Sequence, residues 1–313
     1  MKKWIISVFL FLLLLLAAVF VWIPDQLQIN KKIKVNATQT SVSRVLENKA
    51  NWTRWWPGTS DVSRSKEEQF IYRNVIYTIV NNRFNGVDLL LNNGERNIRS
   101  SLSLLPLLHD SIEVVWQSTI TTGLNPLQKI AVYGTAKKLE KDIDSILYHL
   151  QLFLNKNENI YGSHIQQIIV KDTILIATRM TTSAYPSTRE IYGLIEKLHQ
   201  YIAQQGATEQ NYPMLHVQRK DSSRYETMVA IPVNKGLPER PNLYQKRMVP
   251  GYILVTEVKG GPATIKAAFD QLENYISDYN KSSPAIPFES LVTNRMNEPD
   301  TTKWITRIYY PVY

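Results

Sequence analysis

The second half of the chain carries the same pattern of apolar and polar residues twice. In the first copy, apolar residues recur at helical spacing, at Ile191, Leu194, Ile195, Leu198, Tyr201 and Ile202. The pattern returns 74 residues later, at Ile265, Ala268, Phe269, Leu272, Tyr275 and Ile276. This spacing predicts one amphipathic helix in each copy. A proline at the same offset, Pro213 or Pro287, then opens a strand-like run. We therefore predict a duplicated β-α-β-β unit, with repeats at about 168–233 and 251–313 and a ligand-binding groove between them.

The first half of the chain shows strand patterns followed by one long helix. Strand-like runs lie at 70–80, 87–91, 98–105 and 112–121, after a shorter strand and helix at 27–49. A one-sided apolar stripe then predicts a helix from about Thr135 to Lys156. This order predicts an antiparallel sheet domain closed by a long helix. The polar stretch 155–159 marks a boundary, so we predict domains at 25–156 and 163–313 and an α+β fold class.

Residues 4–23 form an apolar run in which Ser7 is the only polar member. Twenty residues of helix are about as long as a bilayer core is thick. The run therefore predicts a transmembrane anchor at 4–23 and a single-pass membrane protein. Lys2 and Lys3 favour an N-terminus in the cytoplasm with the domains outside it, whereas the lysines at 31–34 favour the reverse. The alternative is a cleaved signal peptide, although 21–24 offers a peptidase no small residues.

Charge and composition narrow the classes of partner. The net charge is +9, and the first 60 residues hold eight Lys and Arg against two acidic residues. Cations beside an apolar segment favour anionic lipid headgroups, whereas nucleic-acid binders carry their excess on the folded domain, so no nucleic-acid partner is predicted. There is no cysteine, and no phosphate-binding loop, nucleophile elbow or zinc-binding helix motif. We predict no cofactor, no metal site and no catalytic residue.

The stretch Asn51-Trp52-Thr53-Arg54-Trp55-Trp56-Pro57 follows the first short helix. With the order of strands and the long helix, it resembles the START-like helix-grip (SRPBCC) superfamily, which includes polyketide cyclase and dehydrase-like proteins. That resemblance implies a cavity for apolar ligands between sheet and helix. The alternative is that Trp52, Trp55 and Trp56 pack in the core.

The second half resembles a gyrase-inhibitor-like (GyrI-like) small-molecule-binding domain, which is also the effector-binding domain of some bacterial transcription activators. The residues that carry the resemblance are Tyr185-Pro186, 226–233, 253–257, Gly260-Gly261-Pro262, Phe288-Glu289 and 305–312. The duplication supports it, because that family is built from two such repeats. The resemblance implies that Glu289 lies in a pocket for lipophilic cations, although Leu291 replaces the aromatic residue common there.

The residues themselves also single out Glu289. It shares a strand face with Leu291 and Thr293, and its counterpart in the first repeat is Leu215. An acid buried alone is costly, so a ligand would explain its presence. The alternatives are that Glu289 is solvated or that Arg295 or another basic residue pairs with it.

The aromatic residues add three further candidates for the pocket. Thirteen of the seventeen tyrosines lie in residues 159–313, and aromatic faces hold organic cations. Tyr192, Tyr225 and Trp304 are the predicted pocket aromatics, although each could equally be core or sheet packing.

The leading hypothesis is a membrane-anchored protein that binds a small amphipathic molecule, cationic molecules included, for sequestration or sensing. The alternatives are a Glu-dependent hydrolase or cyclase of a small lipophilic substrate, and an interaction module for a membrane partner.

Overall fold

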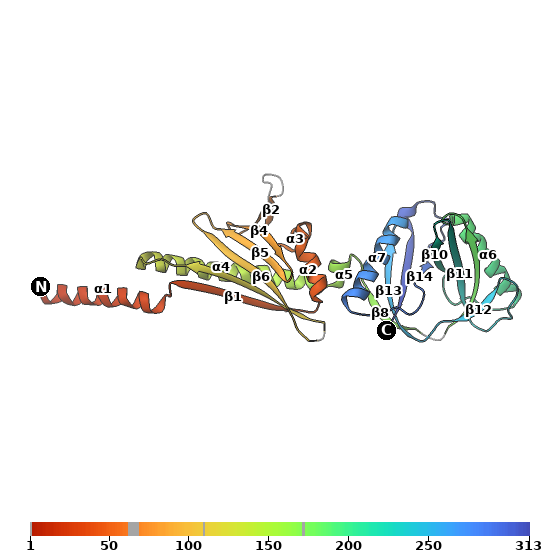
Figure 1. Cartoon of the computed structure of the whole chain (residues 1–313), viewed down its shortest axis with the longest axis horizontal. Coiled ribbons are helices and arrows are strands. Elements are labelled where there is room, and N and C mark those ends of the chain that lie inside the picture. Colours follow the sequence, from red (N-terminus) through yellow and green to blue (C-terminus); the bar gives the residue numbers. More distant parts are fainter. Residues whose placement is uncertain (1, 62–68, 109, 171–172) are drawn as a thin grey trace. The chain divides into compact units, whose positions relative to one another are not determined.

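The computed structural model describes residues 2–61, 69–108, 110–170 and 173–313. The chain divides into two compact units, Met1–Lys156 and Asn157–Tyr313 (Figure 1). The helices within the described residues are α1 (Lys2–Trp22), α2 (Gln39–Glu47), α3 (Lys49–Trp55), α4 (Pro126–Leu154), α5 (Asn157–Tyr161), α6 (Thr188–Gln204), α7 (Pro262–Asp278) and a 3-10 turn, η1 (Thr301–Lys303).

Every strand in the described part of the chain belongs to one of two antiparallel sheets, one in each unit. The strands of the first unit are β1 (Gln26–Val35), β2 (Thr59–Asp61), β3 (Gln69–Tyr72), β4 (Val75–Arg83), β5 (Gly86–Asn92), β6 (Asn97–Pro106) and β7 (Ile112–Thr121). Those of the second unit are β8 (Gln166–Val170), β9 (Ile174–Thr182), β10 (Met214–Asp221), β11 (Arg224–Val233), β12 (Tyr244–Arg247), β13 (Gly251–Lys259), β14 (Phe288–Leu291) and β15 (Ile305–Val312).

The described part of the structure contradicts the prediction of a membrane anchor at 4–23. Helix α1 covers this segment, but no helix in the described part of the chain is long and apolar enough to cross a membrane. The side chains at 5, 6, 8, 9, 12, 13 and 15 of this segment lie outside the described residues. This corrects the fold class at its first element, and with it the single-pass location and the membrane partner.

The first unit is a seven-stranded sheet in the order β1-β7-β6-β5-β4-β3-β2. Helix α4 packs on β1 and β7, and buries the apolar stripe that includes Leu139, Ile143 and Ile146. It begins at Pro126, earlier than predicted, because Asn125 caps it by accepting hydrogen bonds from two backbone N–H groups. Proline is favoured in the first turn of a helix, where its missing N–H costs nothing.

The three tryptophans that follow α2 lie in the core of the first unit. Trp52 is fully buried, and its ring lies 4.8 Å from that of Trp55, 5.9 Å from that of Trp56 and 5.3 Å from that of Phe70. The Trp52 indole N–H donates to the carbonyl of Leu46 at 2.8 Å. These contacts match the alternative of core packing.

An ion-pair network fastens α4 to β1. Lys31 Nζ lies 2.9 Å from Glu140 Oε1 and 3.0 Å from Asp144, and Lys137 Nζ lies 2.8 Å from the other Glu140 oxygen. Hydrogen bonds from Lys137 and then Lys31 lower the pKa of Glu140 to about 2. A carboxyl whose pKa is depressed in the folded protein stabilises it above the unfolded pKa, and that stability is lost as pH falls through the folded pKa.

We expect Glu140→Gln to lower the free energy of unfolding at neutral pH by about 1 kcal/mol or less, because the pair is partly exposed. The difference from the parent should shrink as pH falls from the ordinary carboxyl pKa of 4.5 toward about 2. Urea unfolding at a series of pH values measures it. The exposed Glu95→Gln is the control and should show no such convergence; a gap that persists at pH 2 would contradict the assignment.

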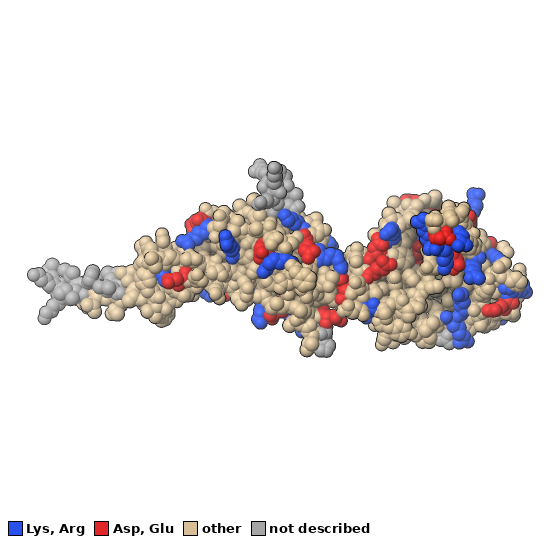
Figure 2. Space-filling model, viewed as in Figure 1, with Lys and Arg blue, Asp and Glu red and all other residues tan. Residues whose placement is uncertain are grey.

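The second unit is an eight-stranded sheet in the order β12-β9-β11-β10-β14-β15-β13-β8. The β10–β14 pair joins the two sequence copies. Helix α6 buries Ile191, Ile195 and Leu198 against the first copy, and α7 buries Ile265, Ala268 and Leu272 against the second. Both helices lie on the same face of the sheet. Figure 2 shows positive and negative side chains interspersed on the face of the unit in view.

Candidate functional site

Glu289 lies at the seam between the two repeats. In β14 it faces Leu215 of β10 on one side and Ile308 of β15 on the other. Leu215 belongs to the apolar core under α6, and Ile308 belongs to the core under α7. Glu289 itself is only 8 % exposed. The duplication therefore places one carboxylate between two apolar cores, on the face of the sheet that the helices cover.

Arg295 pairs with this carboxylate. Its Nη2 lies 2.7 Å from Glu289 Oε2 and 3.0 Å from the hydroxyl of Thr306, and both charged side chains are about one-tenth exposed. The guanidinium carbon lies 4.7 Å from the centre of the Trp304 ring, in cation–π geometry. Arg295 and Trp304 both come from the loop between β14 and β15, which folds back over the site.

Tyr192 fixes that loop to α6. Its hydroxyl accepts a hydrogen bond from the backbone N–H of Arg295 at 2.7 Å and donates one to the carbonyl of Thr293 at 3.3 Å. Burial raises the pKa of Tyr192, and the hydrogen bond from Arg295 opposes that rise. Tyr192 therefore stays a neutral phenol that holds the arginine in place through its backbone.

Tyr225 contacts a second tyrosine, Tyr185. Its ring meets that of Tyr185 edge to face, with centroids 5.9 Å apart. Tyr185 is itself 60 % exposed. Partial burial, and then the negative charge of Glu289, raise the pKa of its hydroxyl. The predicted residues thus divide into Glu289, Tyr192 and Trp304 around Arg295, and Tyr225 one ring further out.

Sequence reasoning left two members of this cluster out of the predicted pocket. Tyr185 was named only for its resemblance to a family motif, and Arg295 only as a partner that would neutralise Glu289. The signal for Tyr185 was its place just before the first repeat helix, at the groove between the copies. Within the described residues, no group of three or more His, Cys, Asp or Glu side chains could hold a metal ion.

The cluster is suited to holding an organic cation against a carboxylate. Glu289 supplies the negative charge, and the Trp304 ring supplies an apolar face whose indole N–H already donates to the carbonyl of Glu298 at 2.8 Å. The guanidinium of Arg295 occupies both positions at once. A carboxylate held in an ion pair and a hydrogen-bond network is poorly placed to accept a proton from a substrate.

Comparison with known proteins gives structural neighbours only, since no family model and no curated protein matches the chain. The C-terminal domain of EcmrR is 16% identical, with a TM-score of 0.42, over 48% of this chain and 98% of that one. A putative transcription regulation protein from Staphylococcus aureus MU50 is 20% identical, with a TM-score of 0.31, over 48% and 99%. SAV2435 bound to tetraphenylphosphonium is 16% identical, with a TM-score of 0.31, over 48% and 94%.

These neighbours include gyrase-inhibitor-like effector-binding proteins, the family that the sequence of the second half resembles. At such identities and TM-scores they do not assign the chain to a family. The comparisons give no support to a membrane anchor or to a helix-grip relationship for the first unit.

Proposed function

We propose that the second unit binds small amphipathic cations at the Glu289 site and thereby sequesters or senses them. The main support is the Glu289 carboxylate, which is nearly buried at the seam of the two apolar cores. Its partner Arg295 lies against the face of the Trp304 ring. A carboxylate in such surroundings costs free energy unless a cation compensates it. In the structure that cation is Arg295.

Binding is then an exchange of one cation for another. The incoming ligand takes the place of the guanidinium beside Glu289 and over the Trp304 ring, and Arg295 turns toward solvent. Because Arg295 and Trp304 share the loop after β14, the exchange moves that loop against its hydrogen bonds to Tyr192. The ligand must therefore gain enough from apolar burial to offset the lost ion pair, which selects lipophilic cations over small hydrophilic ones.

We expect tetraphenylphosphonium to raise the melting temperature of the protein by ~5–10 °C at a concentration of about one hundred times its Kd. Glu289→Gln removes the charge and keeps the shape, so its shift, taken from its own melting temperature, should be small or absent. Differential scanning fluorimetry measures both.

The matched control is Glu257→Gln. Glu257 also lies in this sheet and pairs with an arginine, Arg307, at 2.8 Å, but it is exposed. This variant should keep the full shift. Equal shifts in Glu289→Gln and the parent would overturn the proposal.

A further inference from the structure

One part of the face of the second sheet turned away from α6 and α7 is apolar as well. Side chains alternate along strands. Leu215, Val229 and Leu291 point toward the helices, so their neighbours along each strand point to this second face. They pair across the strands as a ladder that runs Ala177, Ala230, Met214 and Ser290, with Phe288 beside Tyr309. The uncovered face of an antiparallel sheet is usually polar. Covering an apolar surface here with a ligand or another part of the chain would lower the free energy.

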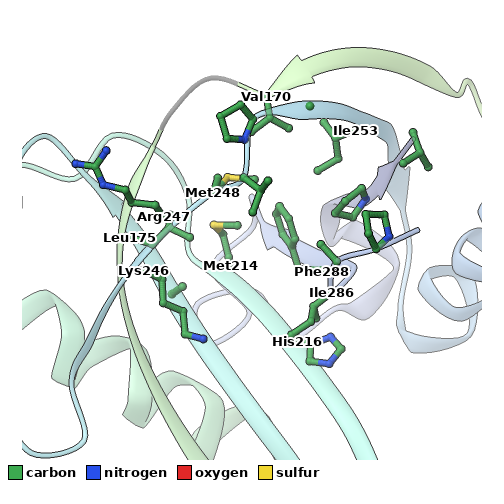
Figure 3. Close-up of a pocket in the computed structure, with 18 of the residues that line it drawn as sticks. Val170, Leu175, Met214, His216, Lys246, Arg247, Met248, Ile253, Ile286 and Phe288 are labelled. Atoms are coloured by element: carbon green, nitrogen blue, oxygen red, sulfur yellow. The ribbon is translucent and has the colours of Figure 1, made fainter. Parts of the chain in front are cut away.

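A cavity of about 330 Å³ lies over this face (Figure 3). In the close-up, Met214, Met248 and Phe288 lie around the same space, with Ile253 above Phe288 and Ile286 below it. A second hollow of about 340 Å³ adjoins it and shares Val170, Met214, Met248, Ile253 and Phe288. Together they are in the size range of small-molecule sites.

Methionines make the walls of the cavity adaptable. Three of the six methionines of the chain, Met214, Met228 and Met248, line it. An unbranched thioether side chain adjusts its shape at little cost, which suits flexible apolar ligands. Exposed apolar residues, among them Val249 and Ile286, stand at its mouth.

The charged side chains that line the cavity are all basic. Lys246 lies at its edge, and none of the described lining residues is Asp or Glu. Lys246 pairs in register with Leu175, which packs on this face of the sheet, so its stem starts from the cavity side. His216 also lines the cavity, and its Nδ1 donates to the carbonyl of Pro287 at 2.8 Å. Burial lowers the pKa of His216, which leaves the ring neutral, with Nε2 as an acceptor.

We propose that this cavity is a second binding site, for a small amphipathic anion such as a medium-chain carboxylate. The alkyl chain lies against Met214, Met248 and Phe288, and the carboxylate lies at Lys246. The site is on the opposite face of the sheet from Glu289 and has the opposite charge preference, so it does not depend on the function proposed above.

Two ligands with the same alkyl chain test the charge preference. Dodecanoate and dodecyltrimethylammonium, each below its micelle concentration, are titrated against the full chain preloaded with the neutral fluorophore N-phenylnaphthylamine. We expect dodecanoate to displace the fluorophore at a concentration at least about tenfold lower, because the cationic rim attracts one head group and repels the other. Equal or stronger displacement by the cation would overturn the proposal.

Two pairs of variants locate the site. Lys246→Glu should weaken dodecanoate by roughly tenfold, whereas Lys197→Glu, which makes the same charge change on the exposed face of α6, should not. Ala285→Trp should fill the cavity from an exposed loop and abolish displacement, whereas Ala267→Trp on the outer face of α7 should not. Both alanines are exposed, so folding should survive.

Three results would contradict this location. They are an equal loss in both lysine variants, full dodecanoate binding in Ala285→Trp, and loss of dodecanoate binding in Glu289→Gln. The last would place the anion in the other site.

Discussion

Replacing Arg295 with methionine is expected to lower the free energy of unfolding by about 3–5 kcal/mol, because it leaves Glu289 buried without a compensating charge. Both side chains are only about one-tenth exposed, and the guanidinium also donates to Thr306. Methionine keeps most of the side-chain volume over the Trp304 ring, so the loss reports charge and not packing. Chemical denaturation of the purified protein measures it.

Removing both charges should recover most of that loss. A buried ion pair is often close in stability to apolar residues of similar volume, since two desolvation penalties disappear with the attraction. The double variant Glu289→Met, Arg295→Met is therefore expected within about 1 kcal/mol of the parent. Arg307→Met, which breaks the exposed pair with Glu257, is the control and should cost about 1 kcal/mol or less. A single variant as stable as the parent would show that the pair is solvated.

The same variant tests the exchange of cations. With Arg295 gone, tetraphenylphosphonium no longer competes with an internal guanidinium, so it should stabilise Arg295→Met more than it stabilises the parent. A smaller shift in Arg295→Met than in the parent would mean that Arg295 supports the ligand instead of occupying its place.

Comparison of the repeats reveals Glu289 in the sequence but not its surroundings. The internal offset pairs Glu289 with Leu215, and in the sheet the two residues are direct cross-strand neighbours. The sequence alone therefore showed an acid at a position where the other repeat has an apolar residue. Arg295 and Trp304 come from the loop after β14, whose path follows no period. The sequence therefore could not predict that the Arg295 guanidinium stacks on the Trp304 ring.

The cavity on the other face also left a trace in the sequence. Residues 229–233 of β11 are buried on both faces of the sheet, and a continuous apolar run is typical of a strand covered on both sides. The cavity itself depends on the connections at 248–251 and 284–286 that pass over the face. Such connections are fixed by tertiary packing, so spacing along the chain could not predict it.

Trp52→Ala is expected to destabilise the protein by about 3–5 kcal/mol, the cost of deleting a large buried aromatic side chain. Trp52 is fully buried against three aromatic rings. The measured loss of stability separates core packing from a ligand cavity as the role of the tryptophan stretch. Truncating a tryptophan that lines an open cavity would lower the free energy of unfolding by less.

Two phenylalanine variants separate packing from hydrogen bonding. Trp52→Phe keeps an aromatic ring but loses the hydrogen bond to the carbonyl of Leu46. The equally buried indole N–H of Trp55 has no acceptor among the described residues, so Trp55→Phe gives up no hydrogen bond. We expect Trp52→Phe to cost about 1 kcal/mol more than Trp55→Phe, measured by urea unfolding. Equal costs would mean that the Leu46 hydrogen bond adds nothing, and that ring packing alone holds α3 against the sheet.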